Sequence, residues 1–292
     1  MTHFFDRAPT IRSVTTVGLS MRSIAAAIIL VQSGSACAFL PTAERDVLVA
    51  IYYSTGGSNW TNHTGWLGKP RTECGWYGVQ CDAASDHVIR LVLSSNNLTG
   101  SLPATISGLP SLFQFSVDHN QLSGPLSTFS NLPALSILDI EYNQLSGPVP
   151  DLTGLPALAY VYADHNQLSA LAPLSGMSSL KHFSARFNAL SGTIPEMSTL
   201  PSLQYFLVSD NSLTGALPSL STLSSLSAIW VHNNALYGPL PLAPFPDNLA
   251  AASSTLCPNR FDARDDPAWD FATGMSPWWT VCDTLFENGF EP

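Results

Sequence analysis

Four acidic side chains stand out because they recur at a regular spacing. Asp118, Glu141 and Asp164 follow one another at intervals of 23 residues, and Asp139 lies two positions before Glu141. Paired carboxylates can catalyse glycoside hydrolysis, hold divalent cations or attract basic ligands. On one strand, Asp139 and Glu141 would point to the same face about 7 Å apart. These carboxylates are the first candidates for a functional site.

Aromatic and basic residues accompany the acids with the same spacing. Exposed aromatic rings beside charges are typical of protein-binding hot spots and of sugar-binding platforms. The alternative is that they are scattered surface residues on a wide sheet. The candidate ligand-binding residues are Asp118, His119, Asp139, Glu141, Tyr142, Tyr160, Tyr162, Asp164, His165, Arg186, Phe187, Tyr205, Trp230 and His232.

The elements that must position these residues are short repeats. The motif N-x-L-x-G recurs with its Asn at intervals of 24, 23, 23, 22, 23 and 23 residues, and Ala170 replaces one Gly in the repeat that is one residue short. Apolar residues five and three positions before each Asn predict one short strand per repeat. We expect each Asn to bond backbone groups of the adjacent coil, and Ala170 to mark a distortion. The repeat asparagines are Asn96, Asn120, Asn143, Asn166, Asn188, Asn211 and Asn234.

The alternation of strand side chains predicts one exposed surface. Residues six, four and two positions before each Asn should point outward onto one sheet. Two positions before Asn, carboxylates occupy three consecutive strands about 4.8 Å apart. Their repulsion should raise at least one pKa or recruit a cation. We expect Arg186 to pair with Asp164. His119 and His165 should flank the acids in the column directly before Asn, with Tyr142 between them.

The sequence argues against an enzyme. It contains no G-x-S-x-G, H-E-x-x-H or phosphate-binding loop. A wide, open sheet provides no deep pocket to exclude water, and a flat row of single carboxylates offers fewer oxygens than the roughly 6 to 8 that calcium prefers. We therefore expect no catalytic activity, no metal site and no cofactor.

The repeats carry a family resemblance. The segments NLTGSLP, NQLSGPVP, NALSGTIP, NSLTGALP and NALYGPLP resemble the plant-specific subclass of leucine-rich repeats, found in plant receptor ectodomains and polygalacturonase-inhibiting proteins. The resemblance covers residues 88–241 in seven copies. It implies an α/β solenoid, a right-handed coil with a parallel sheet on its concave side and turns or short helical pieces on its convex side. Stacked repeats would share one core, and both ends would need caps.

Residues 39–87 are expected to form the N-terminal cap. Residues 41–55 predict a helix opened by Thr42, with Glu44 and Asp46 near its positive end. One side of this helix would carry an apolar stripe made of Val47, Leu48, Ile51 and Tyr52.

The segment after this helix, NWTNHTGWLGKPRTECGWYGVQCD, resembles the N-terminal cap of plant-type leucine-rich-repeat proteins. The resemblance implies that Trp60, Trp66 and Trp76 surround a disulfide between Cys74 and Cys81. A tryptophan cluster that binds sugars is the alternative.

Residues 244–283 do not continue the motif and are expected to cap the last coil. In an exported chain, the cysteines predict two local disulfides, Cys74 with Cys81 and Cys257 with Cys282. Zinc is the alternative, but neither pair has a two-residue spacing and no His lies close to either pair in sequence. Calcium binding and a solvated acidic loop are the two interpretations of a nearby acid cluster, Asp262, Asp265, Asp266 and Asp270.

Residues 1–38 predict an export signal. With Met21 as the start, Arg22 supplies the positive charge, residues 24–31 supply a short apolar stretch, and a small-residue cleavage pattern ends the segment. Eight apolar residues are too few to span a bilayer, which needs about 20. The alternative is a lipid attached to Cys37.

The C-terminal tail, residues 284–292, ends in LFENGFEP. This segment resembles short terminal tags, F-x-x-G-F-E, on exported proteins of some gamma-proteobacteria. The resemblance implies a bacterial source.

Composition narrows the partners. The 292 residues include 11 Lys and Arg against 21 Asp and Glu, a net charge of -10, and no basic run. This disfavours nucleic acids and anionic membranes. We expect a monomer, secreted, periplasmic or on the cell surface, that binds a protein, peptide or glycan on its concave face. The alternatives are a structural or adhesive envelope protein and, from the resemblance alone, an inhibitor of polygalacturonases.

Overall fold

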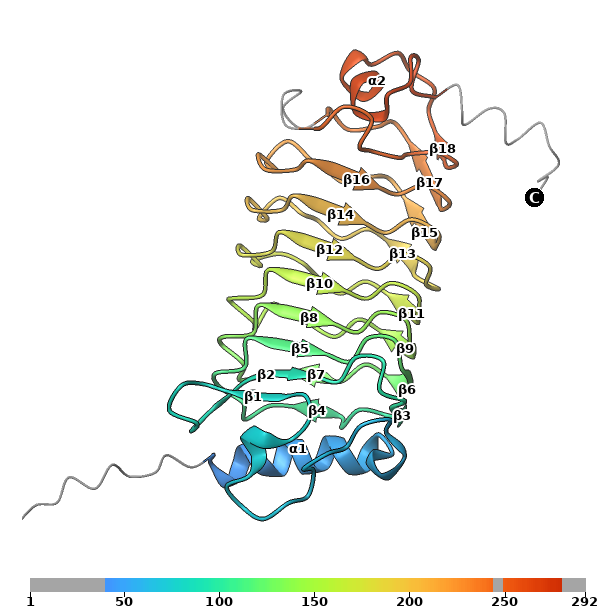
Figure 1. Ribbon diagram of the computed structural model, residues 1–292. Helices are drawn as coiled ribbons and strands as arrows, with labels where there is room; N and C mark the ends of the chain where they lie inside the picture. Colours follow the sequence, from blue (N-terminus) through green and yellow to red (C-terminus); the bar gives the residue numbers. More distant parts are fainter. Residues whose placement is uncertain (1–39, 244–248, 280–292) are drawn as a thin grey trace, which may run out of the picture. The chain divides into compact units, whose positions relative to one another are not determined.

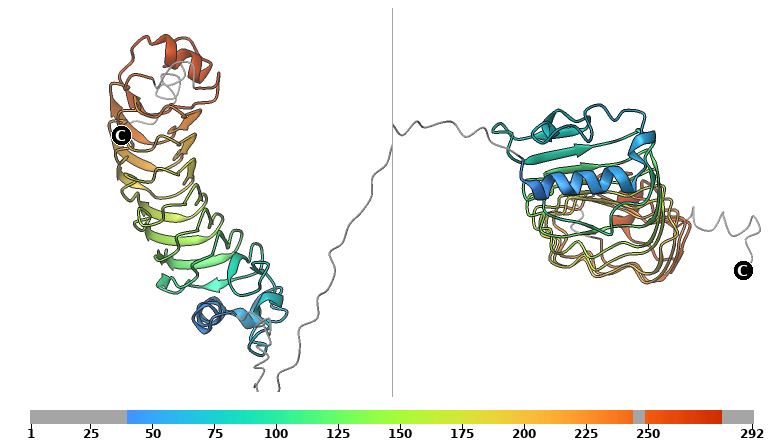
Figure 2. Two further views of the ribbon diagram at one scale, coloured as in Figure 1. Left: turned by 90° about the vertical axis from the view of Figure 1, so that its left-hand side faces the viewer. Right: turned by 90° about the horizontal axis from the view of Figure 1, so that it is seen from below.

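The repeats build a solenoid. The computed structural model describes residues 40–243 and 249–279, so the predicted export signal, Cys37, Cys282 and the C-terminal tail lie outside the described residues. Each repeat forms one coil and contributes one strand to each of two sheets (Figure 1). The stacked coils curve with the first sheet on the concave side (Figure 2). The predicted right-handed leucine-rich-repeat coil is confirmed.

The concave sheet contains one strand from the segment before each of the seven repeat asparagines, and β1 as an additional strand. Neighbouring strands pair in parallel, and β1 joins β2 antiparallel at the N-terminal edge. In order, the strands are β1 (Val79–Cys81), β2 (Val88–Val92), β5 (Gln114–Ser116), β8 (Ile137–Asp139), β10 (Tyr160–Tyr162), β12 (His182–Ser184), β14 (Tyr205–Leu207) and β16 (Ala228–Trp230).

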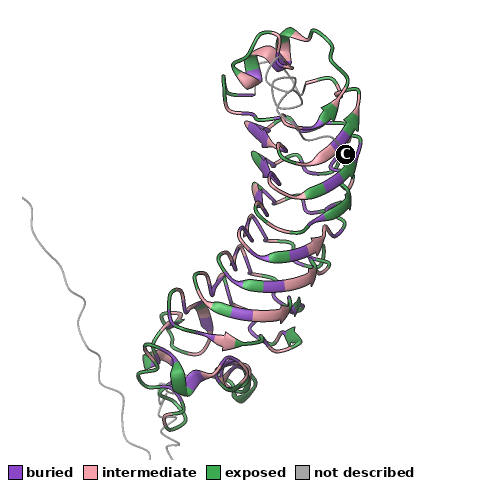
Figure 3. Cartoon of the chain, turned by 90° about the vertical axis from the view of Figure 1, so that its right-hand side faces the viewer, coloured by how far each residue is buried: buried purple, intermediate pink, exposed green. Residues whose placement is uncertain are grey.

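A second sheet runs along the flank of the solenoid and contains the residues that follow each Asn (Figure 3). Outside these two sheets, two short strands, β4 (Thr105–Ile106) and β7 (Thr128–Phe129), pair with each other and join two adjacent coils. The flank strands are β3 (Thr99–Gly100), β6 (Gln121–Pro125), β9 (Gln144–Pro148), β11 (Gln167–Ala170), β13 (Ser191–Thr193), β15 (Ser212–Gly215), β17 (Ala235–Gly238) and β18 (Arg260–Phe261).

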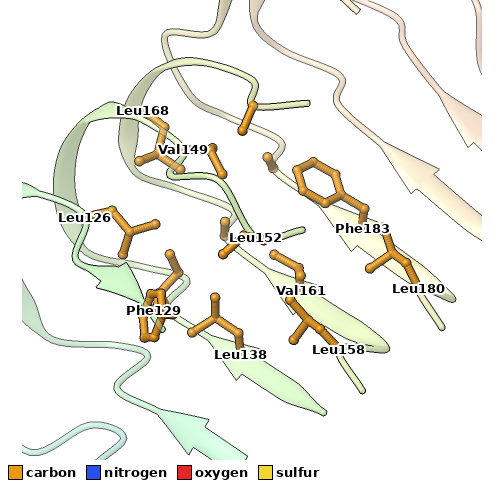
Figure 4. Close-up of a cluster of buried hydrophobic side chains, with 14 of the residues drawn as sticks. Leu126, Phe129, Leu138, Val149, Leu152, Leu158, Val161, Leu168, Leu180 and Phe183 are labelled. Carbon is orange, nitrogen blue, oxygen red and sulfur yellow. The ribbon is translucent and has the colours of Figure 1, made fainter. Parts of the chain in front are cut away.

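One apolar core fills the interior of the coils. Leu138, Val161 and Phe183 come from successive concave strands and stack above one another (Figure 4). These three residues, and Leu152 and Leu158 from the turns between them, are at most 2% exposed. Because each coil buries its apolar side chains only against the adjacent coils, the free energy of unfolding is a sum of contributions from contacts between neighbouring coils.

The repeat asparagines have the predicted structural role. Asn143 accepts a hydrogen bond from the Leu122 N–H (3.0 Å) and donates to the carbonyl oxygens of Val117 (3.0 Å) and Ile140 (3.2 Å). The amide thus satisfies backbone groups in its own coil and in the preceding one.

The coil continues farther than the motif indicated. Asn259 accepts from the Leu236 N–H (2.9 Å) and donates to the Val231 carbonyl (2.8 Å), as the repeat asparagines do. We expected the repeat to stop before Pro244, and this was wrong for residues 249–261. Leu256, three positions before Asn259, was the available signal, but no Gly completes the motif.

The expected distortion at Ala170 is confirmed. The register between β11 and β9 shifts between Leu168 and Ala170. Gly occupies the equivalent position of the six other repeats with positive φ, so Ala170 replaces the permissive residue where the coil is one residue short.

The N-terminal cap is built from α1 (Thr42–Ser54) and two short turns, η1 (Gly57–Asn59) and η2 (Glu73–Gly75). The helix begins at Thr42, as predicted, but Pro41 occupies the N-cap position and no side chain caps the helix. Glu44 instead anchors this end to the first coil, since its buried carboxylate accepts from the Val88 N–H (2.8 Å) and lies 2.6 Å from His87 Nδ1.

The predicted tryptophan cap is also present. Trp60 and Trp76 each contact Trp66, with ring centroids 4.8 and 4.9 Å apart, and all three are at most 8% exposed. The disulfide between Cys74 and Cys81 is formed beside them. The burial of these rings favours the cap over a sugar-binding platform.

The C-terminal cap contains a helix, α2 (Pro267–Thr273), that the sequence did not predict. Asp266 caps this helix by accepting from the Ala268 N–H (3.0 Å), and Asp270 accepts from the Trp278 N–H (2.7 Å). Within residues 40–243 and 249–279, no cluster of His, Cys, Asp and Glu is suited to a metal ion, and no helix is long and apolar enough to cross a membrane. Cys257 is disulfide-bonded.

Replacing Cys74 with Ser should destabilise the N-terminal coils by about 2 to 5 kcal/mol, since the bridge restricts the unfolded cap. Thermal unfolding of oxidised wild type and variant measures this difference. An unchanged midpoint would show that the tryptophan cluster holds the cap without the disulfide.

Replacing Asn143 with Ala should destabilise the solenoid by about 3 kcal/mol or more, because several buried backbone groups lose their partner. Gln144→Ala is the control, since Gln144 is exposed on the flank sheet, and it should change stability by less than about 0.5 kcal/mol. Equal effects in chemical denaturation would contradict the role assigned to the asparagine.

Candidate binding face

The strand register brings the predicted acids onto the concave sheet. Asp139 in β8 lies between Ser116 of β5 and Tyr162 of β10. Asp118, Glu141 and Asp164 follow the strand ends in adjacent coils, where the backbone ladder continues through bonds such as His119 N–H to Glu141 O (3.0 Å). The columns predicted from the repeat are therefore present.

Asp164 is a buried acceptor rather than a free ligand contact. It is 2% exposed. Its carboxylate accepts from Ser184 Oγ (2.5 Å) and from Arg186 through the backbone N–H (2.8 Å) and Nε (2.7 Å). Nη2 of Arg186 completes the predicted ion pair at 2.6 Å. Asp164 thus fixes Arg186, whose guanidinium lies 5.2 Å from the Trp230 ring centroid.

Asp118 is also partnered. Ser94 Oγ donates to one carboxylate oxygen, and His119 Nδ1 lies 3.0 Å from the other. The two ends of the acidic column are thereby satisfied by neighbouring side chains.

The remaining acids, Asp139 and Glu141, form what we call the acid pair. In the part of the chain that the structure describes, no Lys, Arg or His forms an ion pair with either carboxylate. Burial, and then the charges of Asp118 and Glu141, raises the pKa of Asp139 to about 7. Burial also raises the pKa of Glu141, followed by the charges of Asp164 and Asp118. The expected rise is present, but burial outweighs repulsion as its cause.

The column directly before each Asn forms a stack of rings, named here the ring stack: His119, Tyr142, His165 and Phe187. Their centroids are 4.3, 4.2 and 4.4 Å apart in sequence order. All four backbones have φ between 52° and 54°. This left-handed conformation costs bulky residues about 1 to 3 kcal/mol each, part of which the stacking offsets. The other coils use the small polar residues Ser95, Asp210 and Asn233 there.

A second run of rings crosses the middle of the face. This aromatic track consists of Tyr162, His182 and Tyr205, with centroids 4.8 and 5.3 Å apart, and Tyr160 stacks on Tyr162 at 6.5 Å. Burial lowers the pKa of His182, which favours its neutral form. The track joins the acid pair to the C-terminal part of the sheet.

The track ends in a hollow of about 380 Å³. Trp230 forms one wall and is fixed by a bond from Nε1 to the Ser253 carbonyl (2.6 Å). The lining residues are His182, Tyr205, Leu207, Ala228, Trp230, Ala252, Ser253 and Thr255.

His232 lies away from the acid pair. Its Nδ1 is 2.6 Å from Thr255 Oγ1 and its Nε2 is 3.5 Å from Asp210. Sequence reasoning missed Asp210, Ser253 and Thr255. Asp210 stands in the ring-stack column, where its position was the available signal, whereas the other two belong to the coil that the motif did not mark.

Comparisons with known proteins agree with this fold. The Leucine Rich Repeat family model matches residues 87–109. Over 56 residues the chain is 45% identical to Receptor-like protein kinase 5 of Arabidopsis thaliana, and over 111 residues it is 31% identical to a probable leucine-rich repeat receptor-like serine/threonine-protein kinase of the same plant. These matches cover 19% and 34% of this chain, and 6% and 11% of the relatives.

Two solved structures show the same coil. The ectodomain of the plant membrane receptor kinase GASSHO1/SCHENGEN3 from Arabidopsis thaliana matches with a TM-score of 0.67 and 24% identity, over 80% of this chain and 29% of that one. The plant peptide hormone receptor RGFR1, in complex with RGF2, matches with a TM-score of 0.56 and 30% identity, over 63% and 30%. The chain is thus similar to plant receptor ectodomains, and it spans less than a third of the length of these two structures.

Replacing Asp139 with Asn should stabilise the protein increasingly as pH rises from about 4 to about 7. The folded pKa of about 7 exceeds the ordinary 3.8, so the folded protein binds more protons in this window and its free energy of unfolding falls with pH. The measurement is the difference in unfolding midpoint between variant and wild type across pH.

Asp151→Asn is the control of opposite sign. Hydrogen bonds from Thr153 lower the pKa of Asp151, so this change should cost stability above the ordinary pKa and none well below the folded pKa. A difference for Asp139→Asn that is constant with pH would contradict the raised pKa.

Proposed function

We propose that this chain is an exported, non-enzymatic recognition module whose concave face binds a basic peptide or a basic segment of a protein. The observation that carries the proposal is the acid pair, two half-buried carboxylates with raised pKa and no cationic partner among the described residues. A ligand Lys or Arg would supply the missing charge. The predicted export signal supports an extracellular or periplasmic location.

The ring stack supports the same surface. Tyr142 and Phe187 are 43% and 45% exposed, although the fold disfavours bulky residues at their backbone positions. The aromatic residues occupy the four coils in which the adjacent column carries Asp118, Glu141, Asp164 and Arg186. The strained backbone therefore recurs in four consecutive coils, and one of these coils also carries Asp139 and Glu141, which have no ion-pair partner among the described residues.

The geometry favours a peptide over a glycan. Sugars pack on the faces of aromatic rings, but in the ring stack these faces cover one another at interplanar angles of 11° to 22°. Ring edges and carboxylates are left for the ligand. A solved relative described as a peptide hormone receptor, 30% identical, supports a peptide as the ligand class.

Fluorescently labelled octalysine is the probe for this proposal, with octaglutamine and octaglutamate as comparisons. We expect octalysine alone to bind, and its affinity to fall with salt. Glu141→Gln should weaken binding several-fold and leave the solenoid equally or more stable, because a strained charge is removed. Anisotropy titrations and thermal unfolding measure the two effects.

Glu196→Gln is the matched control, because Glu196 is exposed in the turn after β13. It changes net charge equally and should leave binding unaltered. If both variants weaken binding equally, attraction is nonspecific. If Glu141→Gln destabilises the fold and leaves binding intact, the acids are structural, and the chain is better explained as an envelope or adhesive component.

A further inference from the structure

The hollow is a preformed apolar site. It exists because Ala228 is small at the register position where the two preceding strands place His182 and Tyr205. Two contacts hold its Trp230 wall in place, the hydrogen bond from the indole N–H to the Ser253 carbonyl and the Arg186 guanidinium over the ring. Its volume of about 380 Å³ lies within the roughly 300 to 1,000 Å³ of small-ligand pockets.

The chemistry of the hollow differs from that of the acid pair. Its lining contains no Asp, Glu, Lys or Arg. The exposed surface of Tyr205, 40%, and the aliphatic side chain of Leu207 would contact an apolar group. An apolar group that left water here would gain free energy without losing hydrogen bonds.

The aromatic track connects the two places across the strands, with a shift of two residues along the strand direction between Tyr162 and His182. Asp139 lies in β8, and the hollow lies between β14 and β16, three to four strands away. At about 4.8 Å per strand this is about 14 to 19 Å. An extended polypeptide advances about 3.3 Å per residue, so about four to six residues span the distance.

We propose that the hollow receives a large apolar side chain of the same extended polypeptide whose Lys or Arg side chain pairs with Asp139 and Glu141, and that the two side chains lie about four to six residues apart. This rests on the proposed function. The acid pair requires a positively charged side chain in the ligand. The aromatic track between the acid pair and the hollow requires the ligand to lie extended across the strands. The ligand class is therefore a polypeptide segment with one cationic and one apolar anchor.

The test uses labelled 12-residue peptides of alternating Ser and Thr that carry one Lys, with or without one Phe at separations of one to ten residues. Affinity for the full chain should peak when the separation is four to six residues. At the peak, Phe should tighten binding by about tenfold or more over the Lys-only peptide, the gain from burying one large apolar side chain.

Two variants separate the anchors. Ala228→Leu fills the hollow and should remove the gain from Phe while Lys-only binding persists. Glu141→Gln should weaken the Lys contribution and leave the ratio between Phe-containing and Phe-free peptides unchanged. Ala189→Leu, the same change at an exposed position on the flank of the coil, should alter neither.

If Ala228→Leu does not fold, as judged by thermal unfolding, Tyr205→Ala replaces it and should reduce the gain from Phe by removing one wall. The bipartite site is overturned if affinity does not depend on the separation between Lys and Phe, or if the gain from Phe persists in both variants. In either case, binding that still depends on Lys would leave the proposed function standing. If neither these peptides nor octalysine bind, both proposals fail.

Discussion

The side-chain amide of the repeat asparagine is the interaction on which the solenoid depends. At the inward turn of each coil, backbone N–H and C=O groups face the neighbouring coil and cannot reach water. The amide of Asn166 serves both coils. It accepts from the Leu145 N–H (2.9 Å) and donates to the Ile140 carbonyl (2.9 Å) in the preceding coil, and it donates to the Asp164 carbonyl (3.2 Å) in its own coil. Because this bond is repeated, the coils stack in register, and the register aligns the columns of the concave face.

At this same turn, the fold and the binding face favour different residue types. The turn places the residue before each of the seven motif asparagines at positive φ, and small or polar side chains adopt this conformation at little cost. Tyr142 and Phe187 do not adopt it cheaply, yet they belong to the ring stack, and Tyr142 directly follows Glu141, which has no ion-pair partner among the described residues. Natural scaffolds tolerate such local losses where a surface must recognise something. The N-terminal and C-terminal coils, with Ser95 and Asn233 at this position, show what the fold alone requires.

The 23-residue periodicity of the sequence predicted those structural features that recur from coil to coil. The concave strands, the asparagine bonds, the distortion at Ala170 and the ion pair between Arg186 and Asp164 all follow from position within a 23-residue unit. Features that need contacts between dissimilar segments were not predictable in this way. The burial of Asp164 depends on Ser184 one coil away, and the hollow depends on a coil at Asn259 that lacks the motif. For the same reason the raised pKa of Glu141 was foreseen in direction but not in its main cause, and the raised pKa of Asp139 was not predicted, because burial is a property of the assembled sheet.

Each coil contributes one residue to each column, so distances along the concave face are multiples of the spacing between adjacent strands. Gain or loss of one whole repeat between β8 and β14 would move the hollow relative to the acid pair by about 4.8 Å without disturbing the core. Point substitutions, in contrast, would change the chemistry at one place and leave the distance fixed. Such a molecule can diversify in two independent ways. Duplication of a repeat changes the length of the ligand that the face recognises, and point substitution changes the chemistry of one contact.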